Sequence, residues 1–228
     1  MKRSQINDAI RWAIRFCDEH RFRLPVWAYW KPARWAKVGR EADEIRQRLL
    51  GWDVTDFGSG DFARQGLTLF TIRNGVFSAR KDPLAKDYCE KLLLMGENQV
   101  TPMHFHWAKM EDIINRGGGR MVIQLYKATK GERLDRRSSI TVSIDGVRTS
   151  VPAGGKVVLK PGQSITLPPY LYHTFGGQKG HGAVLGGEVS RVNDDARDNR
   201  FLDPLPRFPA IEEDKPKAYL LCTEYAKA

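Results

Sequence analysis

Apolar and polar residues recur along this chain with two different periods, one helical and one typical of strands. Between Ile6 and Cys17 the apolar residues return every three or four positions, which predicts a helix with a single apolar stripe. Ser4 stands just before the stripe and is a candidate N-cap. A second helix is predicted from about Arg40 to Leu50, ending at Gly51.

The segment between the two predicted helices is rich in aromatic residues. Pro25 and Pro32 interrupt the helical pattern, so Leu24 to Trp35 is predicted to be an ordered but irregular connection. We expect its aromatic side chains to pack against the rest of the fold or against a partner subunit. Covering the mouth of a substrate site is the alternative role.

From Leu67 onward the pattern changes to short strands separated by turn residues. Leu67–Arg73 and Val76–Lys81 flank Asn74-Gly75, a dipeptide that favours a type I′ hairpin because both turn positions need positive φ.

Two further turns follow the same logic. Asp145-Gly146 separates Ser139–Ile144 from Val147–Val151 and predicts a second hairpin. Lys160-Pro161-Gly162 marks a turn before a strand at Ser164–Leu167.

Closely spaced strands without helical crossovers are typical of an antiparallel sandwich or barrel. The fold class expected is therefore mainly β, a single-domain, jelly-roll-like antiparallel barrel with N-terminal helices. Residues 1–66 would form a helical and aromatic-rich extension packed on a barrel of residues 67–228, in one structural unit. The final Lys217–Tyr225 is expected to return as a strand.

Length and composition agree with one globular unit. The chain has 228 residues, enough for one well-buried core. No apolar run approaches the ~20 residues that cross a bilayer, and the start of the chain lacks the apolar segment of a signal peptide. Three scattered cysteines, Cys17, Cys89 and Cys222, predict reduced thiols and a cytoplasmic protein.

The formal charge of +10 raises the question of a nucleic-acid partner. The basic residues are dispersed, however, and many stand beside acids, as in Arg40-Glu41 and Glu44-Ile45-Arg46. We interpret the charge as a solvated surface, and we expect neither a nucleic-acid nor a membrane partner.

Histidine spacing is the strongest chemical signal. The chain has five histidines, and His104, His106 and His173 stand in two short segments. His104 and His106 are two positions apart, so on a strand both rings point to one face, roughly 7 Å apart at the backbone. Imidazole nitrogens at this spacing, together with a carboxylate from Glu111, suit a divalent transition metal.

Glu111 needs a change of direction to join the histidines. It is seven residues after His104, the wrong parity for one straight strand face, so a bulge or a strand-end turn must intervene. Four protein ligands would leave two exchangeable positions on an octahedral ion, as a catalytic site requires.

Two more residues are candidates for acid/base chemistry near the metal. Lys109 lies between His106 and Glu111, and a surface lysine at a strand end is its alternative interpretation. Glu188 follows His173 by fifteen residues, about one hairpin, and is flanked by glycine and valine, so we expect it to face the site.

These segments resemble the two motifs of the cupin superfamily, whose small β-barrels hold a metal with two His, a Glu and a third His. The first block runs from Gly96 through His-x-His and Glu111 to Gly118, and the second from Gly162 through Pro168 to His173. The match departs where a glycine and an asparagine are usual, because this chain has Tyr170 and Gly177.

The chain resembles the D-lyxose isomerase family of cupins in particular. The resemblance rests on 100–107, 111–119, 51–55, 66–71, 167–173 and 187–195. It implies an aldose–ketose isomerase acting on free sugars such as D-lyxose/D-xylulose and D-mannose/D-fructose, usually a homodimer. It implies Mn²⁺, with Co²⁺, Fe²⁺, Ni²⁺ or Zn²⁺ as alternatives, on His104, His106, Glu111 and His173. It implies acid/base roles for Lys109 and Glu188.

Three other readings use the same motifs. An Fe(II) cupin dioxygenase would share the four ligands, and a sugar-phosphate isomerase would add a focused Arg/Lys/Ser/Thr cluster at the mouth. A non-catalytic sugar-binding barrel commonly lacks a ligand, whereas this chain keeps all four. If Glu188 is not the base, the acidic stretch Asp194, Asp195 and Asp198 is the next candidate.

Overall fold

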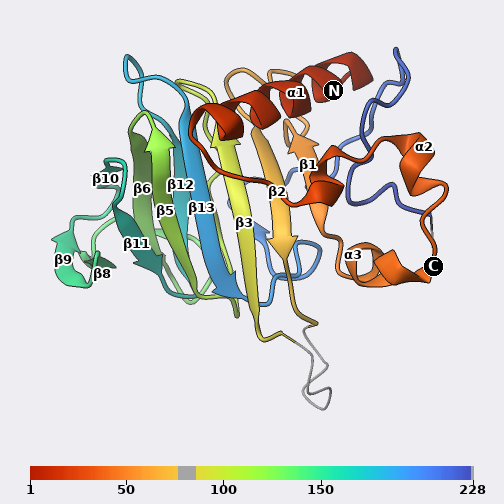
Figure 1. Cartoon of the computed structure of the whole chain (residues 1–228). Coiled ribbons are helices and arrows are strands. Elements are labelled where there is room, and N and C mark those ends of the chain that lie inside the picture. Colours follow the sequence, from red (N-terminus) through yellow and green to blue (C-terminus); the bar gives the residue numbers. More distant parts are fainter. Residues whose placement is uncertain (77–85, 227–228) are drawn as a thin grey trace.

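Two antiparallel sheets face each other in a computed structural model that describes residues 1–76 and 86–226 (Figure 1). The larger sheet has eight strands in the order β1 (Gly51–Thr55), β2 (Leu67–Arg73), β3 (Tyr88–Met95), β13 (Val184–Arg191), β5 (Glu111–Gly118), β11 (Ser164–Leu167), β8 (Ile140–Ile144) and β9 (Val147–Val151). The smaller sheet has the order β10 (Lys156–Leu159), β6 (Met121–Ala128), β12 (Leu171–Gly177), β4 (His104–Phe105) and β14 (Arg200–Phe201), with β7 (Leu134–Asp135) beside β6. The predicted antiparallel two-sheet barrel is confirmed.

Alternation along the strands places the main core between the sheets. In β5 and β6 buried and partly exposed positions alternate, the pattern of a strand with one face on a core. Ile113, Ile123, Leu125 and Phe175 belong to this inner cluster. Every second position therefore points inward, and this parity decides which polar residues reach the interior.

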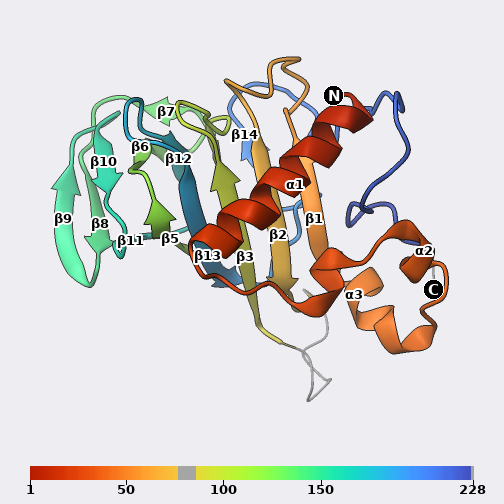
Figure 2. The ribbon, with the colours of Figure 1, turned by 45° about the horizontal axis from the view of Figure 1, so that its top comes forward.

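The first helix, α1 (Arg3–Glu19), lies across the outer face of β1, β2 and β3 (Figure 2). Its predicted apolar stripe is buried against Phe70, Leu92 and Leu94 of the sheet. Ser4 is not the N-cap, since Lys2 takes that position. The helix starts earlier because its first turn is tied to the C-terminal region, and the Ser4 hydroxyl donates to Asp214 at 2.6 Å.

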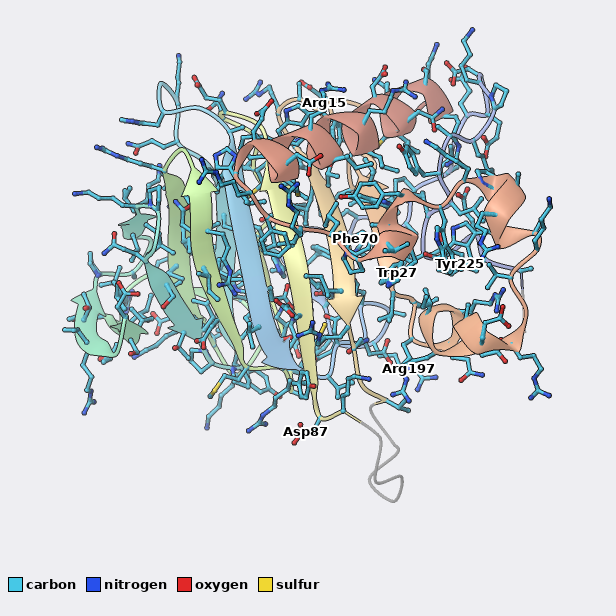
Figure 3. All side chains as sticks on the ribbon, in the orientation of Figure 1. Arg15, Trp27, Phe70, Asp87, Arg197 and Tyr225 are labelled. Atoms are coloured by element: carbon cyan, nitrogen blue, oxygen red, sulfur yellow. The ribbon has the colours of Figure 1, made fainter. Side chains whose placement is uncertain are left out.

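The aromatic connection packs on the outside of the larger sheet and contains short helical turns. These are η1 (Val26–Tyr29), α2 (Pro32–Trp35), η2 (Arg40–Ala42) and α3 (Asp43–Gln47). The Trp27 and Phe70 rings stack 4.7 Å apart, and the Trp35 and Tyr225 rings lie 4.5 Å apart (Figure 3). The second helix is shorter than predicted and begins as a 3₁₀ turn.

The turn chemistry placed most strands correctly. Asp145 and Gly146 both have positive φ, at 49° and 81°, between β8 and β9, and β11 has the predicted bounds. β2 also has its predicted bounds, but it pairs with β3. Residues 77–81 of the predicted partner Val76–Lys81 lie outside the described residues, and Val76 is not in a strand.

Two predictions at the ends of the chain need correction. Lys217–Tyr225 is not a strand, since its one ladder contact with the described residues is an isolated bridge between Leu221 and Trp52. Side-chain contacts hold it instead, including the Tyr225 hydroxyl, which donates to Leu50 O at 2.8 Å. The segment 1–66 also contributes β1 to the sheet, in addition to packing helices on it.

The structure also shows the state of the cysteines and the character of the helices. Cys17, Cys89 and Cys222 are free and buried. Across residues 1–76 and 86–226, no helix is long and apolar enough to span a membrane.

Candidate metal and active site

Strand pairing brings the three predicted histidines together. His104 in β4 is the direct partner of His173 in β12, and His106 follows two residues after His104 with its ring on the same side. One nitrogen from each of these histidines lies within 4.8 Å of the other two. His106 and His173 are buried, and His104 is nearly so. The three rings thus lie close together, and their role as metal ligands stays a prediction.

Backbone carbonyls orient all three rings. His104 Nδ1 donates to Pro102 O at 2.8 Å and His173 Nδ1 to Leu171 O at 2.9 Å, while His106 Nδ1 contacts Asp198 O. A proton fixed on Nδ1 leaves the Nε2 lone pair free for a ligand. Burial and the neighbouring imidazoles hold the pKa of His104 well below its usual value, so this ring stays neutral.

Glu111 reaches the histidines because the chain turns between His106 and Glu111, as its odd spacing from His104 requires. The chain turns after β4, and Glu111 is the first residue of β5. Its Oε1 lies 3.0 Å from His173 Nε2 and 3.5 Å from His106 Nε2. Burial alone would raise the pKa of Glu111, but Lys109 and the histidines hold it well below its usual range.

Two atoms at the centre of this cluster have no hydrogen-bond partner in the part of the chain that the structure describes. They are Glu111 Oε1 and His173 Nε2, both buried. Buried polar atoms are normally satisfied, and a divalent cation would satisfy an anionic oxygen and an imidazole lone pair at once. The three imidazoles and one carboxylate therefore fit a divalent transition metal.

Asp198 holds the turn between the histidines and Glu111. Its Oδ1 accepts from the backbone N–H of Trp107 at 2.8 Å and of Ala108 at 2.9 Å, and its Oδ2 accepts from that of Lys109 at 2.9 Å. Both carboxylate oxygens are thus occupied by backbone donors. Asp198, one of the reserve candidates for the base, has a positioning role in this structure.

Lys109 is buried and does not lie on the surface. Its Nζ is 2.8 Å from Glu111 Oε2 and 2.8 Å from Glu188 Oε1, with Asn193 Oδ1 at 3.3 Å. Burial opposes the charged form, but the two glutamates and Asp195 raise the pKa of Lys109 well above its usual value. Lys109 is therefore a fixed cation between two carboxylates.

Glu188 lies in β13, and its side chain points into the interior. It is an even number of residues from Val184 and Ser190, so all three lie on the same face of the strand. Ser190 Oγ donates to Glu188 Oε1 at 3.1 Å. Lys91, its direct partner on β3, lies 3.7 Å from the same oxygen. The structure thus brings Glu188, Lys109 and Glu111 into one buried group.

A second ionic group lies beside the site, and of its members sequence reasoning named only Asp195. Arg207 Nη2 lies 2.6 Å from Asp53 Oδ2 and 3.0 Å from Asp195 Oδ2, and Lys91 lies 3.4 Å from Asp195. Burial would raise the pKa of Asp195, but Lys91 and Arg207 hold it well below its usual value. Lys91 could have been found from the sequence, because it alternates with Leu93 and Met95, whose side chains point into the core between the sheets.

The second motif keeps its turn despite the missing glycine. Tyr170 has φ of 59°, in the left-handed region that glycine adopts most easily. Its ring lies 5.3 Å from that of Phe105. The Tyr170 ring thus packs on Phe105 although its backbone adopts a conformation that is unfavourable for a residue other than glycine. His173, three residues later, still pairs with His104.

Comparison with known proteins assigns the family. A sequence model of the D-lyxose isomerase family matches residues 1–225. The chain is 50% identical over 228 residues to a D-lyxose/D-mannose isomerase of Serratia proteamaculans, covering 100% of this chain and 99% of that protein. It is 50% identical over 226 residues to a D-lyxose/D-mannose isomerase of Escherichia coli O157:H7, covering 99% and 98%.

The fold is also found in a solved structure. An L-ribose isomerase of Cellulomonas parahominis, crystallised with L-psicose, matches with a TM-score of 0.59 and 14% identity, covering 89% of this chain and 92% of that one. At that identity the likeness concerns the fold, and it agrees with the cupin-type architecture predicted from the motifs.

Proposed function

The chain belongs to the D-lyxose isomerase family and is a sugar isomerase, and we propose that it interconverts D-lyxose with D-xylulose and D-mannose with D-fructose. The observation that carries this proposal is the buried group of three imidazoles and Glu111 beside the Lys109–Glu188 pair. His104, His106, Glu111 and His173 would hold a divalent ion, with Mn²⁺ the first choice. The names of the 50% identical relatives support the two sugars.

Aldose–ketose isomerisation moves a hydrogen between C1 and C2 while carbonyl and hydroxyl exchange places. A bound divalent ion would supply Lewis-acid stabilisation of the negative charge that develops on O1 and O2. The protein must then provide a base for the C2 proton, an acid that returns it to C1, and an environment that excludes water.

Glu188 is the base in this proposal and Lys109 is the cation. Glu188 would accept the C2 proton at a carboxylate oxygen and return it to C1, while the hydroxyl proton passes from O2 to O1, so no net proton is consumed. Lys109 cannot exchange protons readily because Glu111 and Glu188 stabilise its charged form. Its role is therefore to position Glu188 through the 2.8 Å contact and to offset negative charge on the sugar oxygens.

Sugar phosphates are less well supported as substrates. A phosphate site needs cations free to meet the dianion, yet Lys91, Lys109 and Arg207 of the cavity are each paired with carboxylates. The focused basic cluster expected of a sugar-phosphate isomerase is not found among the described residues that line this cavity.

A substrate panel tests the proposal. Metal-loaded protein is incubated with D-lyxose, D-mannose and their phosphates in parallel, and ketose is measured together with oxygen uptake. Ketose from both free sugars without oxygen uptake is the expected result. Ketose only from the phosphates, or oxygen consumption with a reduced organic substrate, would contradict it.

Assembly and location stay predictions. The homodimer follows from the family resemblance, and sedimentation of the metal-loaded protein would test it. The cytoplasmic location and the lack of a nucleic-acid partner rest on cysteine usage and on the dispersed charge.

A further inference from the structure

The enclosed part of the cavity beside the histidines is small compared with the proposed substrate. Its volume is about 40 Å³, and its lining includes His104, Lys109, Glu188 and Asp195. A protein cavity of about 150 Å³ holds benzene, and a pentose has more atoms than benzene. The reacting carbons can lie here only if the remainder of the sugar lies elsewhere.

A larger cavity adjoins it, and we call this the outer chamber. Its volume is about 230 Å³. It lies between the end of α3, the β1–β2 edge of the larger sheet and the segment after β13, the region of Arg197 in Figure 3. Leu69 and Asp195 line both cavities. The two spaces thus share part of their lining.

A second contact links the outer chamber to the reacting groups. Asn193 lines the chamber, and its Oδ1 accepts from Lys109 Nζ at 3.3 Å. Lys109 in turn lies 2.8 Å from Glu188. An open-chain sugar with C1 and C2 beside Glu188 would therefore direct its tail past Asn193 and Asp195 into the chamber.

Arg48 supplies the chamber with an unused donor group. It follows α3 and lines the chamber. Its Nε and Nη1 are buried and have no hydrogen-bond partner among residues 1–76 and 86–226. Buried donors without partners are rare and costly, so a ligand that accepts from this guanidinium would be stabilised.

The other polar groups of the chamber define the ligand chemistry. Its lining includes the carboxylates of Asp53, Asp194 and Asp195 and the amide of Asn74. Asp53 and Asp195 are already paired with Arg207. Arg48 is the one cation among the described lining residues, so a phosphate dianion would find no second cation there. Sugar hydroxyls both donate and accept, so a neutral polyol matches this mixture of groups.

We propose that the outer chamber is the subsite for the hydroxyl-bearing tail of the open-chain sugar and that Arg48 is a specificity-determining residue. The inference rests on the proposed isomerase function and adds to it the place where the substrate's far end binds. A hexose extends one carbon further than a pentose, so its terminal hydroxyl gains most from Arg48. The chamber therefore favours D-mannose over shorter sugars.

Arg48→Met tests this while keeping most of the apolar stem. In the metal-loaded enzyme we expect KM for D-mannose to rise about tenfold, as for the loss of one hydrogen bond to a charged group. The rise for D-lyxose should be under about threefold, with kcat changed less than KM for both. Arg40→Met is the matched control, because it removes the same charge from a side chain that is 98% exposed.

A second variant covers the case in which Arg48→Met does not fold. Ala196 is exposed and lines the chamber, so Ala196→Trp should fill it and raise KM for D-mannose by about tenfold or more, whereas Ala196→Ser should not. The proposal would be overturned if Arg48→Met changed KM equally for D-mannose and D-lyxose, or if Ala196→Trp left KM for D-mannose unchanged. It would also be overturned if the parent enzyme preferred hexose 6-phosphates. A parent enzyme inactive on every free sugar and phosphate would instead refute the proposed function.

Discussion

Asp198→Asn should destabilise the protein by about 3–5 kcal/mol, because one buried carboxylate holds the turn between two metal-ligand candidates. Asp198 is 6% exposed and accepts from three backbone N–H groups. Asparagine can keep the two bonds to Oδ1, but its amide nitrogen would face the N–H of Lys109. Weakening two charged bonds costs about 1 kcal/mol each, and an unpaired buried N–H costs about 1–3 kcal/mol.

Urea unfolding of chelator-treated protein measures this change without a contribution from bound metal. Because His106 stands beside the same turn, the affinity for a divalent ion should fall about 10- to 100-fold in a metal titration. Asp194→Asn is the control, since Asp194 is 28% exposed and makes one 3.2 Å bond to Ala196 N, and it should cost under about 1 kcal/mol. An Asp198→Asn protein within about 0.5 kcal/mol of the parent would refute the positioning role.

Three further predictions follow from other buried groups. Glu188→Gln should lower kcat by about 10² or more with metal content unchanged, and Lys109→Met should lower it too, because it removes the cation nearest to Glu111 and Glu188. Near-normal turnover in both variants would remove the two residues from the mechanism. His173→Ala should abolish stoichiometric metal uptake, seen by elemental analysis, yet keep the far-ultraviolet dichroism of the parent, because the barrel core supplies most of the burial. Arg3→Met should destabilise the protein by about 2–3 kcal/mol, since the fully buried guanidinium bonds Glu213. Arg3 lowers the pKa of Glu213, so this loss should be full above the unfolded-state pKa of a glutamate, about 4.3, and shrink as pH falls through the lowered pKa of Glu213. Urea midpoints from about pH 3 to 7 test the sign.

Local signals in the sequence were enough for most of the predicted strands and for the closeness of the candidate metal ligands. The hairpin at Asp145-Gly146 depends on two adjacent residues adopting positive φ, and the convergence of His104 and His106 depends on strand period alone. Glu111 was placed correctly by the same logic, since its parity required a turn and the structure has one.

Long-range contacts account for what the sequence did not predict. Arg207 and Asp53 are far apart in the chain, and only the folded C-terminal segment places the guanidinium 2.6 Å from the carboxylate. Lys217–Tyr225 has an apolar run suited to a strand, yet it is fixed mainly by side chains, such as Glu224 paired with Arg3. Tertiary contacts thus overrode local propensity at this end of the chain.

The charge balance of the site cavity explains why so many ionised groups can be buried there. The lining contains three cations and three carboxylates, namely Lys91, Lys109 and Arg207 with Glu111, Glu188 and Asp195. Each charge lies within 4 Å of an opposite one, which offsets much of the cost of removing them from water. With a divalent ion held by the histidines and Glu111, the same lining would carry an excess of positive charge. A neutral sugar cannot compensate that excess in its ground state, but the negative charge that develops on its oxygens during enolisation can, and this difference between the two states is what accelerates a reaction.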